Sequence, residues 1–327
     1  MAVTLGDIYK KAVEIGMKND PRTKEDLAAY MKEKKEKLKK MNEAQKKLHA
    51  DWGWNPYDDT RVIYGDLKRQ VEVVYVGIDV ETQELALISA LNGKREREGK
   101  KPIDLALAHH PESHALEGLA GVMEDIQVAT MKEAGIPPNL TSGSLKDRIG
   151  DVTKSVHSDN LHRAKSAAQL LDIPFFCAHT IADNVAYQVV SKIVQKLKPR
   201  KVKDVVEALG KIPHFKKAAE EYSEPISVQT GSLDSWAGKV FVEGYTGGTD
   251  GSAVILKYLS RNAQVGTTIA MHKSKAHRDE ANKHHLNSII TNHMASDALG
   301  MQPLVDWLRS KKIEVVIGCG MIDAKMP

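Results

Sequence analysis

A nearly continuous apolar run that ends in two histidines and a proline constrains the fold of this chain most strongly. The run extends from Ile103 to Ala108, and His109, His110 and Pro111 follow it directly. A short apolar run of this kind predicts a strand buried on both faces of an α/β sheet. Pro111 cannot donate a ladder hydrogen bond, so the strand should end there. Because binding sites in open α/β sheets form at the carboxyl ends of strands, the two histidines mark a candidate site.

The histidine pair suits a metal site only if the backbone turns at the strand end. Neighbouring residues of a regular strand point to opposite faces, so a histidine pair within a strand makes a poor chelate. A turn after Ala108 would bring both rings to one side, where each ring can serve one ion of a close metal pair. On this stretch alone, two hydrogen-bonded histidines at the start of a loop are an equally good interpretation.

Composition favours a metal site built from imidazole and carboxylate groups rather than from thiolates. The 327 residues include 13 histidines but two cysteines, Cys177 and Cys319. So few cysteines cannot form a disulfide framework, which suits a reducing cytoplasm. The chain has no apolar run of about 18 residues, so we expect no membrane span. Its N-terminus lacks the apolar core of a signal peptide, and we therefore expect a cytoplasmic protein.

Short apolar strands alternate with helical segments along most of the chain, which predicts an α/β fold. A β-branched strand at 71–79, a helix at 85–92 and the strand at 103–108 form a βαβ unit, so we expect a parallel sheet. Further strands are predicted at 173–178, 240–245, 264–270, 286–291 and 313–317, and further helices at 119–134, 157–171, 185–197, 203–209, 253–259, 278–284 and 299–309. Residues 210–225 are expected to form a charged connection.

The first 65 residues are predicted to be a helical N-terminal extension. Apolar residues recur at helical spacing in residues 3–19. Residues 24–48 carry interleaved acidic and basic side chains, which favours a solvated helix. A nucleic-acid-binding arm is the weaker alternative, because Glu33, Glu36 and Glu43 interrupt the positive charge and the net charge of the whole chain is only +4.

Two segments that contain glycine are expected to be loops. Residues 139–153 are polar and include glycine and serine, so we expect a loop over the site. Residues 246–251 have the sequence Thr-Gly-Gly-Thr-Asp-Gly and precede the helix predicted at 253–259. These glycines either cradle a phosphate at the helix N-terminus or make a tight turn. No Gly-Lys-Ser/Thr follows them, so the segment is not a P-loop.

Three of the predicted strands end in residues that can bind a metal ion. They deliver His109 and His110, then His179 and Asp183, and finally His293 and Asp297. In the last two pairs the residues are four apart, so on a helical turn they share a face. Any single pair is more often a cap or a core histidine, and Asp297 can equally cap the helix predicted at 299–309. Together the three strand ends supply enough nitrogen and oxygen donors for two zinc, manganese or iron ions that share a carboxylate.

These ordered motifs resemble the NGG-interacting-factor-three family, whose members are also called type 2 GTP cyclohydrolase I-like proteins. The family pattern has an aspartate after an early strand and then a strand that ends in His-His-Pro. Ala-His-Thr follows, with an aspartate four residues after its histidine, and Gly-His followed by Ser/Thr-Glu comes last. The matching residues here are Asp79, His109-His110-Pro111, Ala178-His179-Thr180 with Asp183, and Asn292-His293 with Ser296-Asp297.

The chain departs from the family pattern at several positions. Asp297 replaces the usual final glutamate, and Asn292 replaces the usual glycine before the last histidine. The Thr-Gly-Glu strand end of the family is Thr268-Ile269-Ala270 here, with Met271 and His272 after it. The resemblance spans roughly residues 70–320, and residues 1–65 and the 139–160 stretch within that span look like additions to the family pattern.

The resemblance implies a specific architecture and a specific metal centre. It implies a two-lobed α/β metal-binding domain over residues 66–327, with similar lobes at approximately 66–225 and 226–327 and the metal site between them. It implies two divalent ions held by His109, His110, Asp183, His293 and Asp297, with His179 close by. It also implies a homohexameric ring whose metal sites face the interior.

Two classes of function are consistent with the sequence. The first is a GTP cyclohydrolase-like hydrolase, in which a metal-bound hydroxide attacks a nucleotide or another small molecule that contains a heterocyclic ring. His179 or His272 would move protons as catalytic residues, because histidine titrates near neutral pH. The second is a non-catalytic metal-binding ring that engages protein or nucleic-acid partners. The enzyme is favoured, because metal sites with spare coordination are usually reactive.

Overall fold

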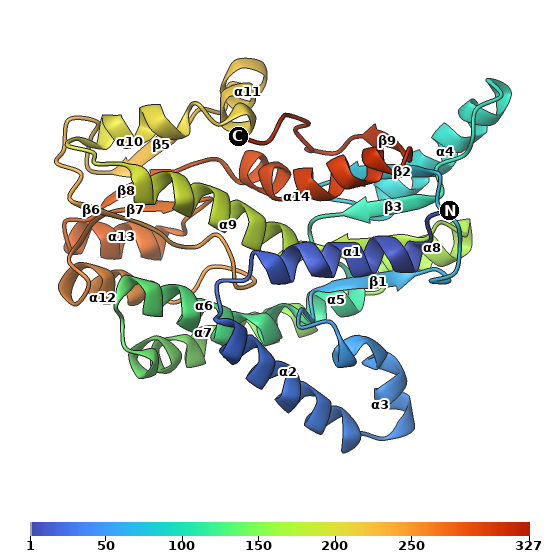
Figure 1. Cartoon of the computed structure of the whole chain (residues 1–327), viewed down its shortest axis with the longest axis horizontal. Helices are drawn as coiled ribbons and strands as arrows, with labels where there is room; N and C mark the ends of the chain where they lie inside the picture. Colours follow the sequence, from blue (N-terminus) through green and yellow to red (C-terminus); the bar gives the residue numbers. More distant parts are fainter. Residues whose placement is uncertain (1) are drawn as a thin grey trace.

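Two β-sheets, with helices outside and between them, form the molecule (Figure 1). The computed structural model describes residues 2–327. The first sheet contains, in spatial order, β1 (Thr60–Tyr64), β4 (Phe175–Ala178), β3 (Leu105–Ala108), β2 (Val73–Gly77) and β9 (Glu314–Ile317). The second sheet contains β5 (Ser227–Thr230), β8 (Asn287–Ile290), β7 (Val265–Ala270) and β6 (Lys239–Val242). The predicted α/β fold is confirmed.

Helices make up most of the rest of the chain. They are α1 (Leu5–Lys18), α2 (Lys24–Lys39), α3 (Glu43–Leu48), α4 (Thr82–Arg97), α5 (Ser113–Glu117), α6 (Met123–Ala134), α7 (Pro138–Ser158), α8 (Arg163–Leu171), α9 (His179–Lys196), α10 (Val202–Leu209), α11 (Pro213–Tyr222), α12 (Ile255–Arg261), α13 (Lys275–Lys283) and α14 (His293–Ser310), with 3-10 turns η1 (Ala50–Gly53) and η2 (Leu119–Val122). Within residues 2–327, no helix combines the length and the apolar character that a membrane crossing requires.

The two lobes repeat one topology. In the first, β2, β3 and β4 are parallel neighbours and β1 runs antiparallel along β4. In the second, β6, β7 and β8 are parallel neighbours and β5 runs antiparallel along β8. The last parallel strand of each lobe leads directly into a long helix, β4 into α9 and β8 into α14. The two helices therefore occupy equivalent positions, which agrees with the expected pair of similar lobes.

The largest hydrophobic core lies between the two sheets. Side chains of β2 alternate, so that Val74 and Val76 face this central core while Val73 and Tyr75 face the opposite side of the sheet. Helices α1, α9 and α14 contribute apolar side chains to the central core. Helices α4 and α8 cover the outer face of the first sheet, and α12 and α13 cover that of the second. Both sheets are thus buried on two faces, as parallel strands require.

Helices α9 and α14 pack against each other at unusually short range. They run side by side in the middle of the molecule (Figure 1). Gly300 of α14 lies on the backbone of α9, where a Cβ atom would overlap the carbonyl group of Ala182. A glycine is needed at this crossing because any side chain would push the helices apart. Asp183 and Asp297 lie on the two helices close to this crossing.

Two segments expected to be irregular are helical instead. The loop expected at 139–153 is part of α7, in which Thr141, Leu145 and Val152 are buried at helical spacing. Pro138 occupies the first turn, where its fixed φ favours a helix, and the glycines of α7 do not interrupt it. The connection expected at 210–225 contains α11, which buries Phe215 and Ala218. The helix expected at 157–171 is broken at residues 159–162, between α7 and α8.

The N-terminal 65 residues are joined closely to the first lobe. Helix α1 buries Leu5 and Ile8 in the central core, and β1 is an edge strand of the first sheet. The domain boundary expected at residue 65 would therefore separate β1 from the other strands of the sheet to which it belongs. Helices α2 and α3 form the part that projects from the body of the molecule (Figure 1). At the other end of the chain, β9 pairs with β2 and so belongs to the first sheet, although its residues fall in the expected second lobe.

Gly300→Ala should destabilise the protein and disturb the α9–α14 crossing. Overpacking of this kind costs about 1–3 kcal/mol of unfolding free energy. The matched control is Gly150→Ala in α7, where no atom lies within 4 Å of the added Cβ. That substitution should stabilise the protein by up to about 1 kcal/mol, because alanine is the better helix former. Urea unfolding of both variants measures the difference, and equal stabilities would show that the crossing tolerates a side chain.

His114 of α5 should make the protein less stable in acid. Burial, with Arg61 and Lys165 nearby, lowers the pKa of His114 from 6.5 to about 4. The unfolded chain takes up this proton near pH 6.5 and the folded chain near pH 4, so stability falls as the pH decreases through this window. His114→Gln should remove a pH-dependent loss of up to about 3 kcal/mol.

The measurement is the unfolding free energy of wild type and His114→Gln at pH 7 and pH 4. The exposed His157 of α7 supplies the control variant His157→Gln, which should keep the wild-type difference between the two pH values. If His114→Gln loses as much stability in acid as wild type does, the acid sensitivity has another source.

Candidate metal centre

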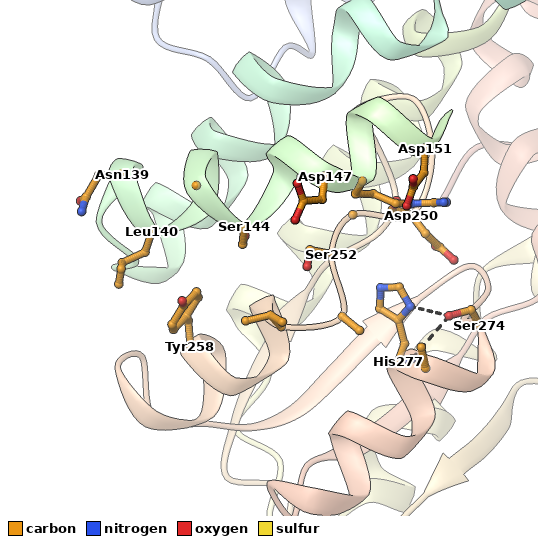
Figure 2. A pocket seen from close by; sticks show the side chains of 16 residues that line it. Asn139, Leu140, Ser144, Asp147, Asp151, Asp250, Ser252, Tyr258, Ser274 and His277 are labelled. Atoms are coloured by element: carbon orange, nitrogen blue, oxygen red, sulfur yellow. Dashed lines mark hydrogen bonds between the residues drawn. The ribbon is translucent and has the colours of Figure 1, made fainter. Parts of the chain in front are cut away.

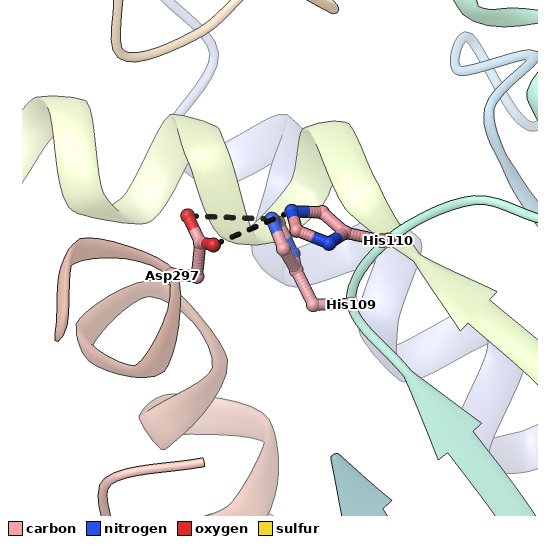
Figure 3. A group of neighbouring side chains, drawn as sticks. All are labelled: His109, His110 and Asp297. Atoms are coloured by element: carbon pink, nitrogen blue, oxygen red, sulfur yellow. Dashed lines mark ion pairs between the residues drawn. The ribbon is translucent and has the colours of Figure 1, made fainter. Parts of the chain in front are cut away.

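The backbone turns at the end of β3 and brings the His109 and His110 rings together. The amide of His110 donates to the carbonyl of Ile78 at 2.9 Å, which fixes the turn after the strand. The two ring centroids are 5.0 Å apart. Figure 3 shows both rings directed toward Asp297 of α14. The predicted turn at the strand end is therefore present, and both histidines face one site.

Helices α9 and α14 deliver two equivalent His-x-x-x-Asp motifs from the two lobes. His179 is the first residue of α9 and Asp183 follows one turn later. His293 and Asp297 have the same places in α14. Asn292 precedes α14 with φ at 77°, and its side chain accepts a hydrogen bond from the amide of Ala295. The family pattern has glycine here, and asparagine is among the residues found more often than most others at positive φ.

Histidine and carboxylate atoms converge at separations that suit ligands of one ion. Two donors that lie about 2.1 Å from a tetrahedral ion are about 3.4 Å apart, whereas hydrogen bonds between them would be shorter. The observed separations are 3.4 Å from His109 Nε2 to Asp183 Oδ1, 3.5 Å from His109 Nε2 to Asp297 Oδ1, 3.5 Å from His110 Nε2 to Asp297 Oδ2, 3.4 Å from His293 Nε2 to Asp297 Oδ2, and 3.8 Å from His179 Nε2 to Asp183 Oδ2.

Asp297 is the clearest sign that a cation belongs here. Its side chain is fully buried, and neither carboxylate oxygen has a hydrogen-bond partner within residues 2–327. A buried ionised carboxylate without such partners is costly unless a cation or metal ion compensates it. Asp297 is not the cap of α14, because the helix begins at His293 and Asn292 caps it. The residues present therefore fit a metal ion.

Two groups of side chains can each hold a metal ion. One consists of His109, His110 and Asp297, and the other of His109, His179 and Asp183. His293 adjoins the first group through Asp297. Imidazole and carboxylate donors without thiolate suit zinc, manganese or iron.

Three histidines of the site are anchored by a carboxylate at Nδ1. His110 Nδ1 lies 2.6 Å from Asp79 Oδ1, His179 Nδ1 lies 2.8 Å from Asp59 Oδ2, and His272 Nδ1 lies 3.0 Å from Asp250 Oδ1. A carboxylate that accepts the Nδ1 proton leaves Nε2 free to bind a metal and orients the ring. For His110 and His179, the Nε2 atoms are those that face Asp297 and Asp183.

Sequence reasoning did not identify Asp59 or Asp250. Asp59 precedes β1, and the register of β1 with β4 pairs Thr60 with Ala178, which places Asp59 across from His179. Thr180 also donates a hydrogen bond to Asp59, at 2.6 Å. No local motif marks this contact, because it depends on strand pairing between distant segments. Asp250 lies in the glycine-rich segment, where the prediction considered only phosphate binding and a tight turn.

The glycine-rich segment packs as a turn rather than as a phosphate cradle. The Gln127 side chain of α6 donates hydrogen bonds to the carbonyls of Gly247 and Thr249 at 2.8 and 2.9 Å. Gly247 and Gly248 lie against α6 and η2, where side chains would clash. The segment encloses a cavity of about 30 Å³ beside the histidines. The tight-turn alternative is the one that this packing supports.

Charge and burial give the two central carboxyls different titration behaviour. Burial raises the pKa of Asp183 to about 7, although His179 acts in the opposite direction. Burial also acts to raise the pKa of Asp297, but His109 and His110 outweigh it and hold that pKa at about 2. Burial acts to lower the pKa of His110, but Asp297 and Asp79 raise it to about 10. A cation at this site therefore competes with the proton of His110.

His179 and His272, the predicted catalytic residues, lie in different surroundings. His179 is held between Asp59 and Asp183 and belongs to one of the two possible metal groups. His272 lies outside both groups, is paired with Asp250, and packs its ring 4.5 Å from that of His293. Its side chain is 38% exposed, so solvent reaches it.

Asp59→Asn should weaken metal binding. An amide cannot accept the Nδ1 proton of His179 as strongly as a carboxylate does, so the ring loses its orientation and basicity. Substitutions of this kind typically cost 10- to 100-fold in metal affinity, and we expect a loss of about that size. Titration with a competing chelator measures the affinity.

Asp66→Asn, at the exposed turn after β1, is the matched control and should bind metal as wild type does. Thermal unfolding without metal reports whether Asp59→Asn remains folded. Unchanged affinity in a folded Asp59→Asn protein would show that His179 needs no anchor.

Comparison with known proteins supports the family resemblance. No protein-family model and no curated protein sequence matches this chain. Among solved structures it is similar to a NIF3 superfamily protein from Sphaerobacter thermophilus, with a TM-score of 0.67 and 25% identity over 80% of this chain and 91% of that one. It also matches reduced HcgD from Methanocaldococcus jannaschii, with a TM-score of 0.47 and 14% identity over 80% of this chain and 88% of that one. A Bacillus cereus protein related to NIF3 matches with a TM-score of 0.41 and 12% identity over 82% and 92% of the two chains.

Proposed function

We propose, from the premise that this chain has the fold of the NIF3 superfamily, that it is a hydrolase dependent on two divalent metal ions. Its substrate would be a small molecule with a heterocyclic ring, of which a nucleotide is one kind. The observation that carries the proposal is the fully buried Asp297 carboxylate, whose oxygens face His109, His110 and His293 without a hydrogen bond.

Each residue of the centre has a distinct role in this proposal. His110, His293 and Asp297 would hold one ion, and His179 and Asp183 the other, with His109 within reach of both carboxylates. Divalent ions of this kind lower the pKa of water and polarise an acyl or phosphoryl oxygen. Asp59 and Asp79 keep two of the imidazole rings in place.

His272 is the residue best placed to move protons. It belongs to neither metal group, it reaches solvent, and Asp250 holds its Nδ1. Burial acts to lower the pKa of His272, but the pairing with Asp250 outweighs burial and raises it. A histidine in these surroundings can donate a proton to a leaving group near neutral pH. His179, by contrast, is assigned to the metal rather than to proton transfer, because both of its ring nitrogens face carboxylates.

The test of the metal centre is the metal content of Asp297 variants. Asp297→Asn should lose much of one metal equivalent, because a neutral amide is a far weaker ligand than a carboxylate. Asp297→Glu restores the family residue and should retain metal. Asp306→Asn, on the exposed side of the same helix, is the matched control and should keep the wild-type content. Elemental analysis at equal purity that finds no loss in Asp297→Asn would contradict the proposal.

The test of catalysis is a hydrolysis screen with heterocyclic substrates after each metal is restored. Turnover that disappears in Asp297→Asn and returns in Asp297→Glu supports a hydrolase. A protein that binds metal but turns over no substrate would instead fit the non-catalytic ring. The hexameric assembly implied by the resemblance is part of the same proposal, and light scattering measures it.

A further inference from the structure

A large cavity lies beside the metal centre and is not part of it. It has a volume of about 600 Å³, opens to solvent and is lined by α7, the segment at 250–254, α12 and the start of α13 (Figure 2). Sites for small molecules typically measure about 300–1,000 Å³. The space directly beside the histidines is about 30 Å³, which has room for an ion or water but not for an organic ring. The body of a substrate therefore needs neighbouring space, and this cavity supplies it.

Asp250 connects the cavity to the metal centre. It lines the cavity, and its Oδ1 atom lies 3.0 Å from Nδ1 of His272. The ring of His272 in turn packs against the ring of His293. One end of the cavity is therefore separated from the centre by a single pair of side chains.

The cavity is apolar at one end and acidic at the other. Leu140 and Tyr258 lie together at the end far from Asp250 (Figure 2). Asp147 points into the cavity from α7, and Asp151 lies close to Asp250 at the opposite end (Figure 2). A ligand that matches this lining has an apolar body and a polar group that points toward the metal centre.

The charge of the lining selects against anions. Asp147 and Asp151 are one helical turn apart on the same face of α7, a like-charge spacing that destabilises an isolated helix. Neither forms a salt bridge with any residue in the described range 2–327. The one arginine of the lining, Arg148, donates from Nε to the backbone carbonyl of Asp250 at 2.9 Å. Asp250 is already paired with His272, so the carboxylates of the lining without an ion-pair partner in residues 2–327 are those of Asp147 and Asp151, both exposed. Two such carboxylates against one guanidinium repel a polyphosphate and attract a cation.

We propose that this cavity binds a small organic cation, an amine or amidine with an apolar body, and presents it to the metal centre. The proposal rests on the function proposed above and narrows the substrate to nitrogen-bearing molecules without phosphate groups. Asp147 and Asp151 attract the cationic group, and Tyr258 packs against the apolar body. Helix α7 lies in the stretch at 139–160 that departs from the family pattern, so the preference belongs to this chain.

The probes that test this are benzamidine, benzamide and benzoate, which have nearly the same shape and carry charges of +1, 0 and −1. Their binding to the metal-loaded protein is measured by calorimetry or ligand-observed NMR. Benzamidine should bind about fivefold to tenfold more tightly than benzamide, because it gains two partly exposed ion pairs. Benzoate should bind more weakly than benzamide.

Variants of α7 and α12 assign the preference to this cavity. The double substitution Asp147→Asn and Asp151→Asn should reduce benzamidine binding to the level of benzamide. Asp159→Asn, an exposed aspartate just after α7 and outside the cavity, is the matched control and should leave all three affinities unchanged. Tyr258→Ala should weaken the three probes by similar factors, because it removes a contact to the shared phenyl ring.

Several outcomes would overturn the proposal. They are benzoate binding as tightly as benzamidine, no binding of any probe, or an unchanged benzamidine affinity in the folded double variant. If the double variant does not fold, the order of the three probes on wild type decides alone. Metal content is measured on the same samples. If no probe binds to protein with a full metal content, the proposal for the cavity is rejected and the proposed metal centre is not. If benzamidine binds to protein that holds no metal, the proposed function is rejected and the proposal for the cavity is not.

Discussion

The close crossing of α9 and α14 is the contact on which the rest of the site depends. Gly300 lets the backbones of the two helices meet at Ala182, so the helices that open with His179 and His293 pack side by side. Each helix continues from a parallel strand of its own lobe, and the group of His109, His110 and Asp297 draws its residues from both lobes. The candidate metal centre therefore depends on the interface between the lobes. Its geometry is set by backbone packing in the central core rather than by flexible loops.

The aspartates that anchor histidine rings near this crossing come from three different kinds of structural element. Asp79 follows a central parallel strand, Asp59 precedes an antiparallel edge strand, and Asp250 lies in a turn held by Gln127 of α6. Each carboxylate fixes the tautomer of one ring, so the protein sets the direction of Nε2 before an ion arrives. In residues 2–327, neither His109 nor His293 has a carboxylate at Nδ1, and His109 is the more deeply buried of the two. It is buried between both central carboxylates and its Nδ1 atom has no partner in residues 2–327, so packing alone orients it.

The sequence predicted the parts of the site that carry their own local signal. His109 and His110 follow an apolar strand, and the spacing of four in the later pairs places each histidine and aspartate on one helix face. Asp59 could not be found in this way, because its contact with His179 spans 120 residues and depends on the register of β1 and β4. The prediction of a loop at 139–153 was wrong. It relied on the glycine and polar residues of the segment and overlooked the helical spacing of Thr141, Leu145 and Val152, which are buried. The sequence therefore did not predict α7, the helix that lines one side of the large cavity.

The return of β9 to the first sheet has a consequence for how the chain reaches its native state. β9 pairs with β2, and Glu314 forms a bidentate ion pair with Arg95, which lies 219 residues earlier in the chain. The first sheet is therefore interrupted in sequence by the whole second lobe and stays incomplete on the ribosome until that lobe has been made. Contacts of such long range slow folding and leave a sheet edge open meanwhile. Asp297 also follows most of the second lobe, so the group of His109, His110 and Asp297 can form only after that lobe has been made, whereas the group of His109, His179 and Asp183 needs no residue beyond the first lobe.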